Sequence, residues 1–242
     1  MTGQTEGLGS SDWDIEELQA LLMLQTVFSW NGTRSQRKAT RDGFPTLARI
    51  AKAMNLLQQA GPGHFAYSPL HNCQHTQRAP ISAEHFNWHA WLAQEQRNRV
   101  LYQLYLTDAA MVMFFNMIPQ IDSLDMRLML PADDAAWDAR DSQECANALG
   151  LNGPQAQSKN LTGTRRPSQP SMRDAMRTLI DAGAMFNPSS TNAYAKFILV
   201  HAIIVRIIAC QKTILLQDST FQGFIFGPVS YTHLTLPTKR IV

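Results

Sequence analysis

Histidine and cysteine side chains gather in one polar stretch, between residues 61 and 89, where they could bind a metal ion. His71, Cys73 and His75 alternate along the chain, and His85 and His89 lie four residues apart, so this second pair would share a helix face. Known zinc motifs separate their paired ligands by characteristic intervals that this stretch does not supply. We therefore expect a polar surface loop here and no metal ligands.

Two carboxylates lie inside the longest apolar segment, and a cooperating pair of that kind could act as acid and base. Glu95 and Asp108 are thirteen residues apart. That separation is about 20 Å along an unbroken helix, too far for two carboxylates that share one reaction. We expect no catalytic residues and a fold-stabilising role for both. Asp108 needs a partner if it is buried, and we expect one from another helix.

Four cations occur at helical spacing, and such a row could bind phosphate. Arg34, Arg37, Lys38 and Arg41 fall on one face of a helix. No aromatic residue or glycine-rich loop accompanies them, so an ordinary solvated face is the favoured interpretation.

The composition is that of a folded domain. The chain has 242 residues, of which 45% are hydrophobic and 17% charged, and its net charge is +2. This charge is too small to predict a nucleic-acid surface. Three distant cysteines indicate reduced thiols rather than a disulfide framework. The polar, acidic N-terminus excludes a secretory signal. The most apolar window, 197–210, is shorter than the ~20 residues that span a bilayer, so we expect a core helix and no membrane partner.

Apolar periodicity of the helical kind recurs along the chain, and convincing strand alternation does not. We therefore predict an all-α fold, an irregular bundle of several helices. Pro45 should kink or restart the second helix. Ser82 is the expected N-cap of the third, Asp133 that of the fourth, and the last helix should be central. The expected helices span about 15–30, 33–60, 83–118, 134–149, 171–183 and 192–217.

Composition also divides the chain. Residues 1–13 should be loose, residues 14–150 the first helical part, residues 151–169 a flexible connector, and residues 170–228 further helices of the same domain. The tail 229–242 contains VSYTHLTLPT, which resembles a translated sequencing adapter. We expect this tail to be an artefact and the gene product to be truncated there.

An ordered pattern covers the fifty residues from 88 to 137: two tryptophans, an acidic and two basic residues, a tyrosine, an aspartate, a proline, a Leu-Pro pair and a third tryptophan. It resembles the fungal-specific transcription factor domain, the regulatory middle homology region, with similar flanks over about 14–217. Asn98 departs from the resemblance, because the family often has a third basic residue there. The residues are Trp88, Trp91, Glu95, Arg97, Arg99, Tyr102, Asp108, Pro119, Leu130, Pro131 and Trp137.

The resemblance implies an all-α regulatory module of a nuclear transcription factor acting with RNA polymerase II, and no enzyme. Such a domain receives a small-molecule effector or a co-regulator protein and controls attached DNA-binding and activation regions. DNA would be bound only through an upstream zinc module that this fragment lacks, of the two-cysteine, two-histidine type by spacing. No cofactor is expected in the fragment itself. The resemblance leaves open whether the domain forms a dimer.

Two other functions compete with a regulatory domain. An all-α enzyme acting on an apolar small molecule would need Glu95, Asp108 and a histidine together at the floor of a pocket. A helical scaffold would show a packed bundle without a cavity. Met111, Met113, Met117, Met126 and Met129 could line an adaptable pocket, although filling the core is the favoured role for each.

Overall fold

The computed structural model describes residues 14–71, 84–151, 169–181 and 183–214, and the backbone alone of residues 83, 159–160, 163–164 and 215–217. Contacts divide the chain into two units, Met1–Val205 and Arg206–Val242, which we describe separately. The expected loose N-terminus and the expected artefact tail lie outside the described residues, as does most of the connector.

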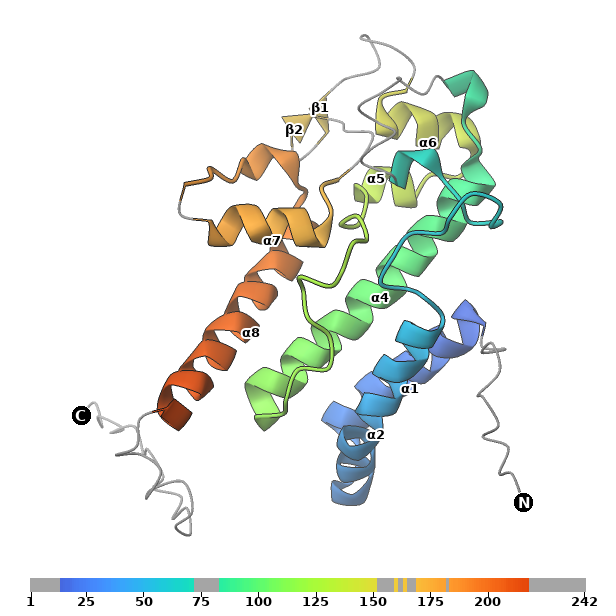
Figure 1. The fold of residues 1–242 in the computed structure, drawn as a ribbon. Coiled ribbons are helices and arrows are strands. Elements are labelled where there is room, and N and C mark those ends of the chain that lie inside the picture. The colour runs from blue at the N-terminus through green and yellow to red at the C-terminus, as the bar shows by residue number, and fades with distance from the viewer. Residues whose placement is uncertain are drawn as a thin grey trace, which may run out of the picture. The chain divides into compact units, whose positions relative to one another are not determined.

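The first two helices form a hairpin (Figure 1). Helix α1 spans Ile15–Asn31, and Asp14 caps it in a capping box with Glu17. Helix α2 spans Arg34–Ala53 after the cap Thr33. Gly32 joins the two helices at a point where a Cβ atom would clash with the carbonyl oxygen of Phe28.

Helix α2 differs from our expectation in two respects. It runs unbroken through Pro45, and it ends at Ala53 instead of near Gly61. Asn55 adopts a left-handed conformation (φ 54°), and the N–H of Leu56 then bonds back to Ala51. Asparagine tolerates this conformation better than most residues, so it supplies the stop signal that we had placed at the glycines.

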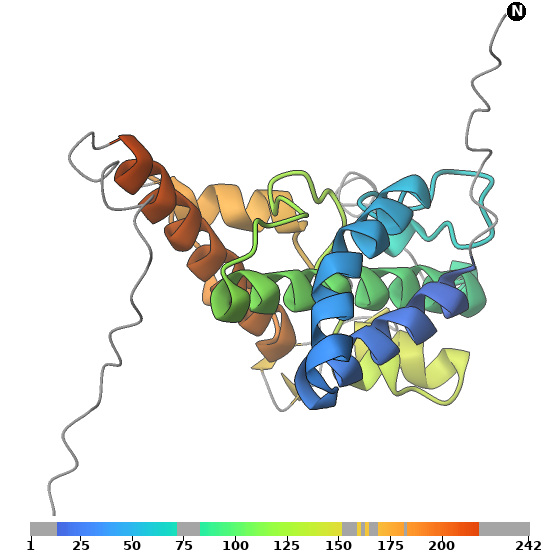
Figure 2. The same ribbon diagram turned by 90° about the horizontal axis from the view of Figure 1, so that it is seen from below.

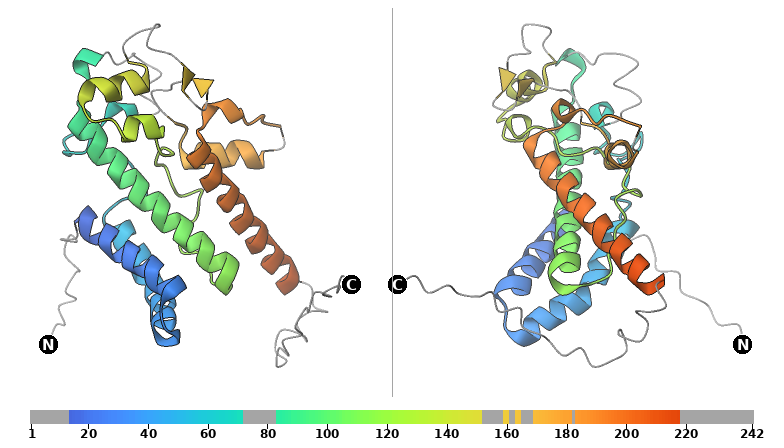
Figure 3. Two further views of the ribbon diagram at one scale, coloured as in Figure 1. Left: turned by 180° about the vertical axis from the view of Figure 1, so that it is seen from behind. Right: turned by 90° about the vertical axis from the view of Figure 1, so that its left-hand side faces the viewer.

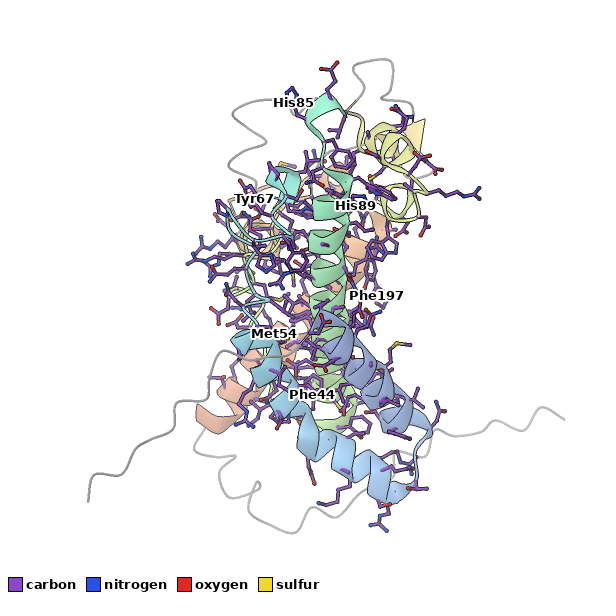
Figure 4. All side chains as sticks on the ribbon, turned by 90° about the vertical axis from the view of Figure 1, so that its right-hand side faces the viewer. Phe44, Met54, Tyr67, His85, His89 and Phe197 are labelled. Atoms are coloured by element: carbon purple, nitrogen blue, oxygen red, sulfur yellow. The ribbon has the colours of Figure 1, made fainter. Side chains whose placement is uncertain are left out.

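Helix α4, Trp88–Phe115, is the longest element of the fold. It starts later than predicted, because Asn87 caps it by accepting a hydrogen bond from the N–H of Ala90. Glu84 and His85 lie before it in a short 3-10 helix, η2 (Ala83–His85), so His85 and His89 do not share a helix face (Figure 4). It ends before Pro119, at Asn116, which is also left-handed (φ 55°).

The hairpin packs on α4 and makes the main core with it (Figure 2). Leu18 and Leu22 of α1, Phe44 of α2, and Leu101 and Leu104 of α4 are all buried there. Apolar residues at three- and four-residue steps on each helix produce these facing stripes.

A second, smaller core lies at the start of α4. Trp91 packs there with Leu70 of η1 (Pro69–His71) and with Ala136, Cys145 and Leu149. The last three belong to α5 (Asp134–Trp137) and α6 (Ser142–Leu149). We had expected one helix in place of these two. The chain breaks it because Asp141 caps α6 anew, accepting from the N–H of Glu144.

The remaining elements follow the connector. They are the two-residue strands β1 (Lys159–Asn160) and β2 (Gly163–Thr164), helix α7 (Met172–Ile180), the 3-10 helix η4 (Pro188–Ser190) and helix α8 (Ala193–Gln217). The predicted all-α class is confirmed, since the short β1–β2 pair is the sole sheet among the described residues (Figure 3).

Helix α8 is less enclosed than the predicted central helix. Ala195, Ile198, Leu199 and Ala202 are buried in the main core, whereas Phe197 and Val200 are about half exposed. By length and hydropathy, the stretch Ala193–Ile214 is the one described helix that could cross a membrane. Of its most apolar part, 28% is buried. The core helices of many proteins pass this test, so it decides little. The second unit begins inside α8, and its Ile207 and Ile214 are exposed.

Trp91→Ala should lower the free energy of unfolding by about 3–5 kcal/mol, because the ring is 1% exposed and its loss leaves a cavity in the second core. Urea denaturation of the full chain measures this. Phe65→Ala is the control, since that ring is 75% exposed and its loss should cost below about 1 kcal/mol. Equal losses for the two variants would contradict the assignment of Trp91 to a core.

Candidate functional site

The carboxylate of Glu95 is completely buried, and four donors surround it. Oε1 accepts from Nε of Arg99 at 3.0 Å and from the backbone N–H of Ala132 at 2.9 Å. Oε2 accepts from Nε2 of His71 at 3.1 Å and from the amide of Asn98 at 3.4 Å. These donors come from α4, from η1 and from the segment before α5, so one charge holds three parts of the chain together.

Arg99 extends this network outward. Its Nη2 donates to the carbonyl of Ala132 and to Oδ1 of Asp134, both at 3.1 Å. Its guanidinium lies over the ring of Trp137, at 4.7 Å from the centroid, and 5.8 Å from that of Tyr194. Glu95 and Arg99, four residues apart on α4, therefore form an ion pair between a fully buried carboxylate and a partly buried guanidinium. Through Arg99, this pair joins α4 to α5 and to the start of α8.

Amide side chains on α4 complete the interior of the network. The amide of Gln94 accepts from the N–H of Ala60 at 2.9 Å and donates to Asn98 at 2.8 Å. Both amides are fully buried. Asn98, which departs from the family pattern, thus occupies a position where a third basic residue would have no water.

The segment 126–132, which contains the Leu-Pro pair, is hydrogen-bonded on both sides. On the α4 side, the hydroxyl of Tyr102 donates to the carbonyl of Leu128 at 3.0 Å. On the other side, the N–H of Leu130 donates to Pro170 at 2.9 Å, and the amide of Asn192 donates to the carbonyl of Pro131 at 2.9 Å. The extended backbone that proline requires of the preceding residue makes these lateral bonds available.

A cavity of about 440 Å³ adjoins Arg99, and this volume lies within the range of ligand sites, ~300–1,000 Å³. Residues of α1 and α4 make up most of its lining, and Trp137 of α5 and Tyr194 of α8 complete it. Its lining is mostly apolar, with amide groups among it. The residues are Gln19, Leu22, Met23, Thr26, Val27, Gln96, Arg99, Val100, Gln103, Trp137 and Tyr194.

Most of this lining was not predicted. Arg99 and Trp137 belong to the recognised pattern, but Tyr194 and the α1 residues were not singled out as site residues. The signal that could have found the cavity is the apolar stripe of α1, which is too wide for one buried face. Leu22 faces the core, whereas Met23 and Val27 are 63% and 52% exposed and line the cavity.

Asp108 and Pro119 form a separate site at the far end of α4. Oδ2 of Asp108 accepts from the backbone N–H groups of Gln120 and Ile121, at 2.8 and 2.9 Å. Our expectation of a partner from another helix was wrong, because the turn that follows Pro119 folds back onto α4. Burial raises the pKa of Asp108 to about 6, although these two hydrogen bonds and the charge of Lys52 lower it.

The other residues of the pattern lie apart from the Glu95 network. Trp88 and Trp91 belong to the second core. Nη2 of Arg97 donates to the carbonyl of Met54 at 3.3 Å, and burial lowers the pKa of this guanidinium. The pattern therefore describes several contacts of one long helix, and the cavity meets only two of its residues.

The structure corrects one part of the metal hypothesis. His71 is buried against Glu95, so placing it in a polar surface loop was wrong. Cys73 and His75 lie outside the described residues. Within the described ranges, no three His, Cys, Asp or Glu side chains could hold a metal ion together.

Two cations of the row that could have bound phosphate have partners within the chain. Lys38 pairs with Asp42 at 2.7 Å, and Arg41 lies over the Phe115 ring at 5.0 Å from its centroid.

The arrangement that would favour an enzyme is not formed by these residues. Glu95 does meet a histidine, but neither side chain lines the cavity, and Asp108 is bound at the opposite end of α4. The cavity argues equally against a plain scaffold. None of the five methionines that could have lined a pocket lines this cavity. Met111, Met126 and Met129 are buried in the core, which was the favoured role.

Comparison with known proteins identifies the family. The fungal-specific transcription factor domain matches residues 5–179, which is most of the chain. The chain belongs to this family. The match includes α1, α2, α4 and α7, and thus nearly all of the Glu95 network and the cavity wall. No solved structure matches the chain.

Relatives of this fungal-specific transcription factor domain are named transcription factors. Transcription factor 1 of Elsinoe fawcettii is 24% identical over 168 residues, which are 69% of this chain and 16% of the relative. Transcription factor verF of Penicillium polonicum is 25% identical over 138 residues, 57% of this chain and 17% of the relative. Transcription factor PfmaH of Pestalotiopsis fici is 29% identical over 63 residues, 26% of this chain and 7% of the relative. The chain thus matches about a sixth of the first two relatives.

Asp108→Asn should change how stability depends on pH. The Asp108 pKa rises from 3.8 to about 6 on folding, so the folded state binds the extra proton between these values. Wild-type stability should therefore fall by roughly 2–3 kcal/mol between pH 4 and pH 7, an amount that the variant does not lose. Urea unfolding at four pH values measures the difference.

The control for this experiment is Asp125→Asn, which removes an exposed carboxylate. Its stability curve should run parallel to that of the wild type across the range. A parallel curve for Asp108→Asn as well would contradict the raised pKa.

Proposed function

We propose that this chain is the effector- or partner-responsive regulatory domain of a larger, zinc-dependent transcription factor that acts in the nucleus with RNA polymerase II. The zinc and the DNA contacts belong to a module outside this chain. Family membership, and relatives several times longer than the chain, support this proposal. In the proposal the domain is not an enzyme.

The observation that carries regulation is the position of the cavity beside the Glu95 network. Arg99 belongs to both: it lines the cavity, and it binds Glu95, Ala132 and Asp134. A ligand that moves this side chain would act on the segment before α5 and on α4 together. This coupling requires two arrangements of the network that a ligand favours unequally.

A reporter assay tests the proposal. The full chain is placed between a bacterial repressor's DNA-binding domain and a strong activation region, and transcription of a reporter gene is measured in yeast. Val27→Trp fills the cavity and should change reporter output by about fivefold or more, in either direction, which is the lower end of typical allosteric coupling.

The control is Leu24→Trp, at a position of α1 that is similarly exposed but does not line the cavity. It should leave the output of the wild-type fusion unchanged, and immunoblots should show equal amounts of each fusion. If Val27→Trp and the deletion of the whole chain both leave output unchanged, the domain is a passive scaffold and the proposal fails.

A further inference from the structure

The chemistry of the cavity restricts what it can bind. Leu22, Met23, Val27 and Val100 give it apolar walls, and the rings of Trp137 and Tyr194 add apolar area. Surfaces of this kind favour ligands that leave water through the hydrophobic effect. The ligand should therefore be largely apolar.

Arg99 keeps one donor group for a polar atom of the ligand, beside the amide groups of Gln19, Gln96 and Gln103 in the lining. Nε and Nη2 of Arg99 bond to Glu95, Ala132 and Asp134, whereas Nη1 has no hydrogen-bond partner within the described residues. Since a guanidinium only donates, a ligand atom that meets this nitrogen must be an acceptor, such as a carbonyl or hydroxyl oxygen.

The charge around Arg99 decides between a charged and an uncharged acceptor. Arg99 is the one charged side chain among the described residues that line the cavity, but the carboxylates of Glu95 and Asp134 lie 3.0 and 3.1 Å from it. Two negative charges face one positive charge. Even a protonated His71, on the far side of Glu95, would bring the sum only to zero. The site therefore has no excess positive charge for an anion.

We infer that this cavity binds an uncharged, largely apolar small molecule whose carbonyl or hydroxyl oxygen accepts a hydrogen bond from Arg99. The inference rests on the proposed function, in which the cavity is the effector site, and adds the chemical class of the effector. The inference excludes carboxylates, phosphates and sulfonates, which an arginine in the lining of a cavity would otherwise suggest.

Two fluorescent probes that differ in charge test the inference. One is the ketone 6-propionyl-2-(dimethylamino)naphthalene, and the other is 6-(dimethylamino)-2-naphthoate, which carries a carboxylate in place of the ketone. Titrated into the full chain, the ketone should bind and the naphthoate should bind about tenfold more weakly or worse. Val27→Trp and Met23→Trp should abolish ketone binding, and Leu24→Trp should not, with folding checked by circular dichroism.

A charge variant sharpens the comparison. Asp134 is an exposed partner of Arg99, so Asp134→Asn should not unfold the chain. It removes one of the two negative charges and should raise the affinity for the naphthoate, relative to that for the ketone, by about threefold. The control is Asp125→Asn, which should change neither affinity.

Each result decides something. Equal or tighter binding of the naphthoate to the wild type overturns the inference, even if the reporter responds to Val27→Trp and the proposed function stands. Probe binding that Val27→Trp and Met23→Trp leave intact overturns the cavity as a small-molecule site. Selective ketone binding together with an unresponsive reporter keeps the ligand class and rejects the regulatory function.

Discussion

A carboxylate without contact with water is the constraint on which the rest of this domain depends. An ionised group taken out of water loses several kcal/mol of solvation, and only well-placed donors can replace that solvation. Glu95 obtains them from Arg99, Ala132, His71 and Asn98. Since each donor belongs to a backbone that must be in place, the charge specifies how η1, α4 and the segment 126–132 meet. An apolar residue at position 95 would pack without demanding any of this.

The same constraint explains the position of the cavity. Arg99 must lean toward Glu95 and Asp134 to pair with both, and Trp137 and Tyr194 then lie beside its guanidinium. Helix α1 packs on α4 through Leu18 and Leu22, which leaves Met23 and Val27 facing the space beside Arg99. One side of the cavity is therefore α1, which packs on α4 through apolar contacts. Another side is formed by Arg99, which ion pairs hold in place, together with Trp137 and Tyr194.

The sequence predicted those features that depend only on residues close together in the chain. The predicted cap Asp133 follows from residue type before a helix, and the spacing of Glu95 and Arg99, i and i+4, is that of a helical ion pair. Boundaries failed where an alternative local signal won: Asn87 capped α4 in place of Ser82, and Asn55 ended α2 early. Asp108 was predicted to need a partner, but the turn that supplies it depends on how the chain folds back after Pro119.

The site was harder to predict than the elements, because its parts meet only in three dimensions. His71 lies 24 residues before Glu95, and Tyr194 lies 95 residues after Arg99, with no periodicity to connect them. Family resemblance selected Glu95, Arg99 and Trp137, yet it could not reveal that Asn98 is buried or that α1 forms a wall. Such pairings are set by tertiary packing, which a single sequence does not record.

The central claim is that the buried Glu95–Arg99 pair organises the domain, and a double-mutant cycle tests it most directly. Glu95→Gln and Arg99→Gln, singly and together, give a coupling free energy from urea unfolding. Lys38 and Asp42 have the same spacing on α2 but are exposed, which makes them a matched control. We predict a coupling of about 2–3 kcal/mol for the buried pair and about 0.3–0.5 kcal/mol for the exposed pair. A coupling at Glu95–Arg99 no larger than that at Lys38–Asp42 would contradict the claim.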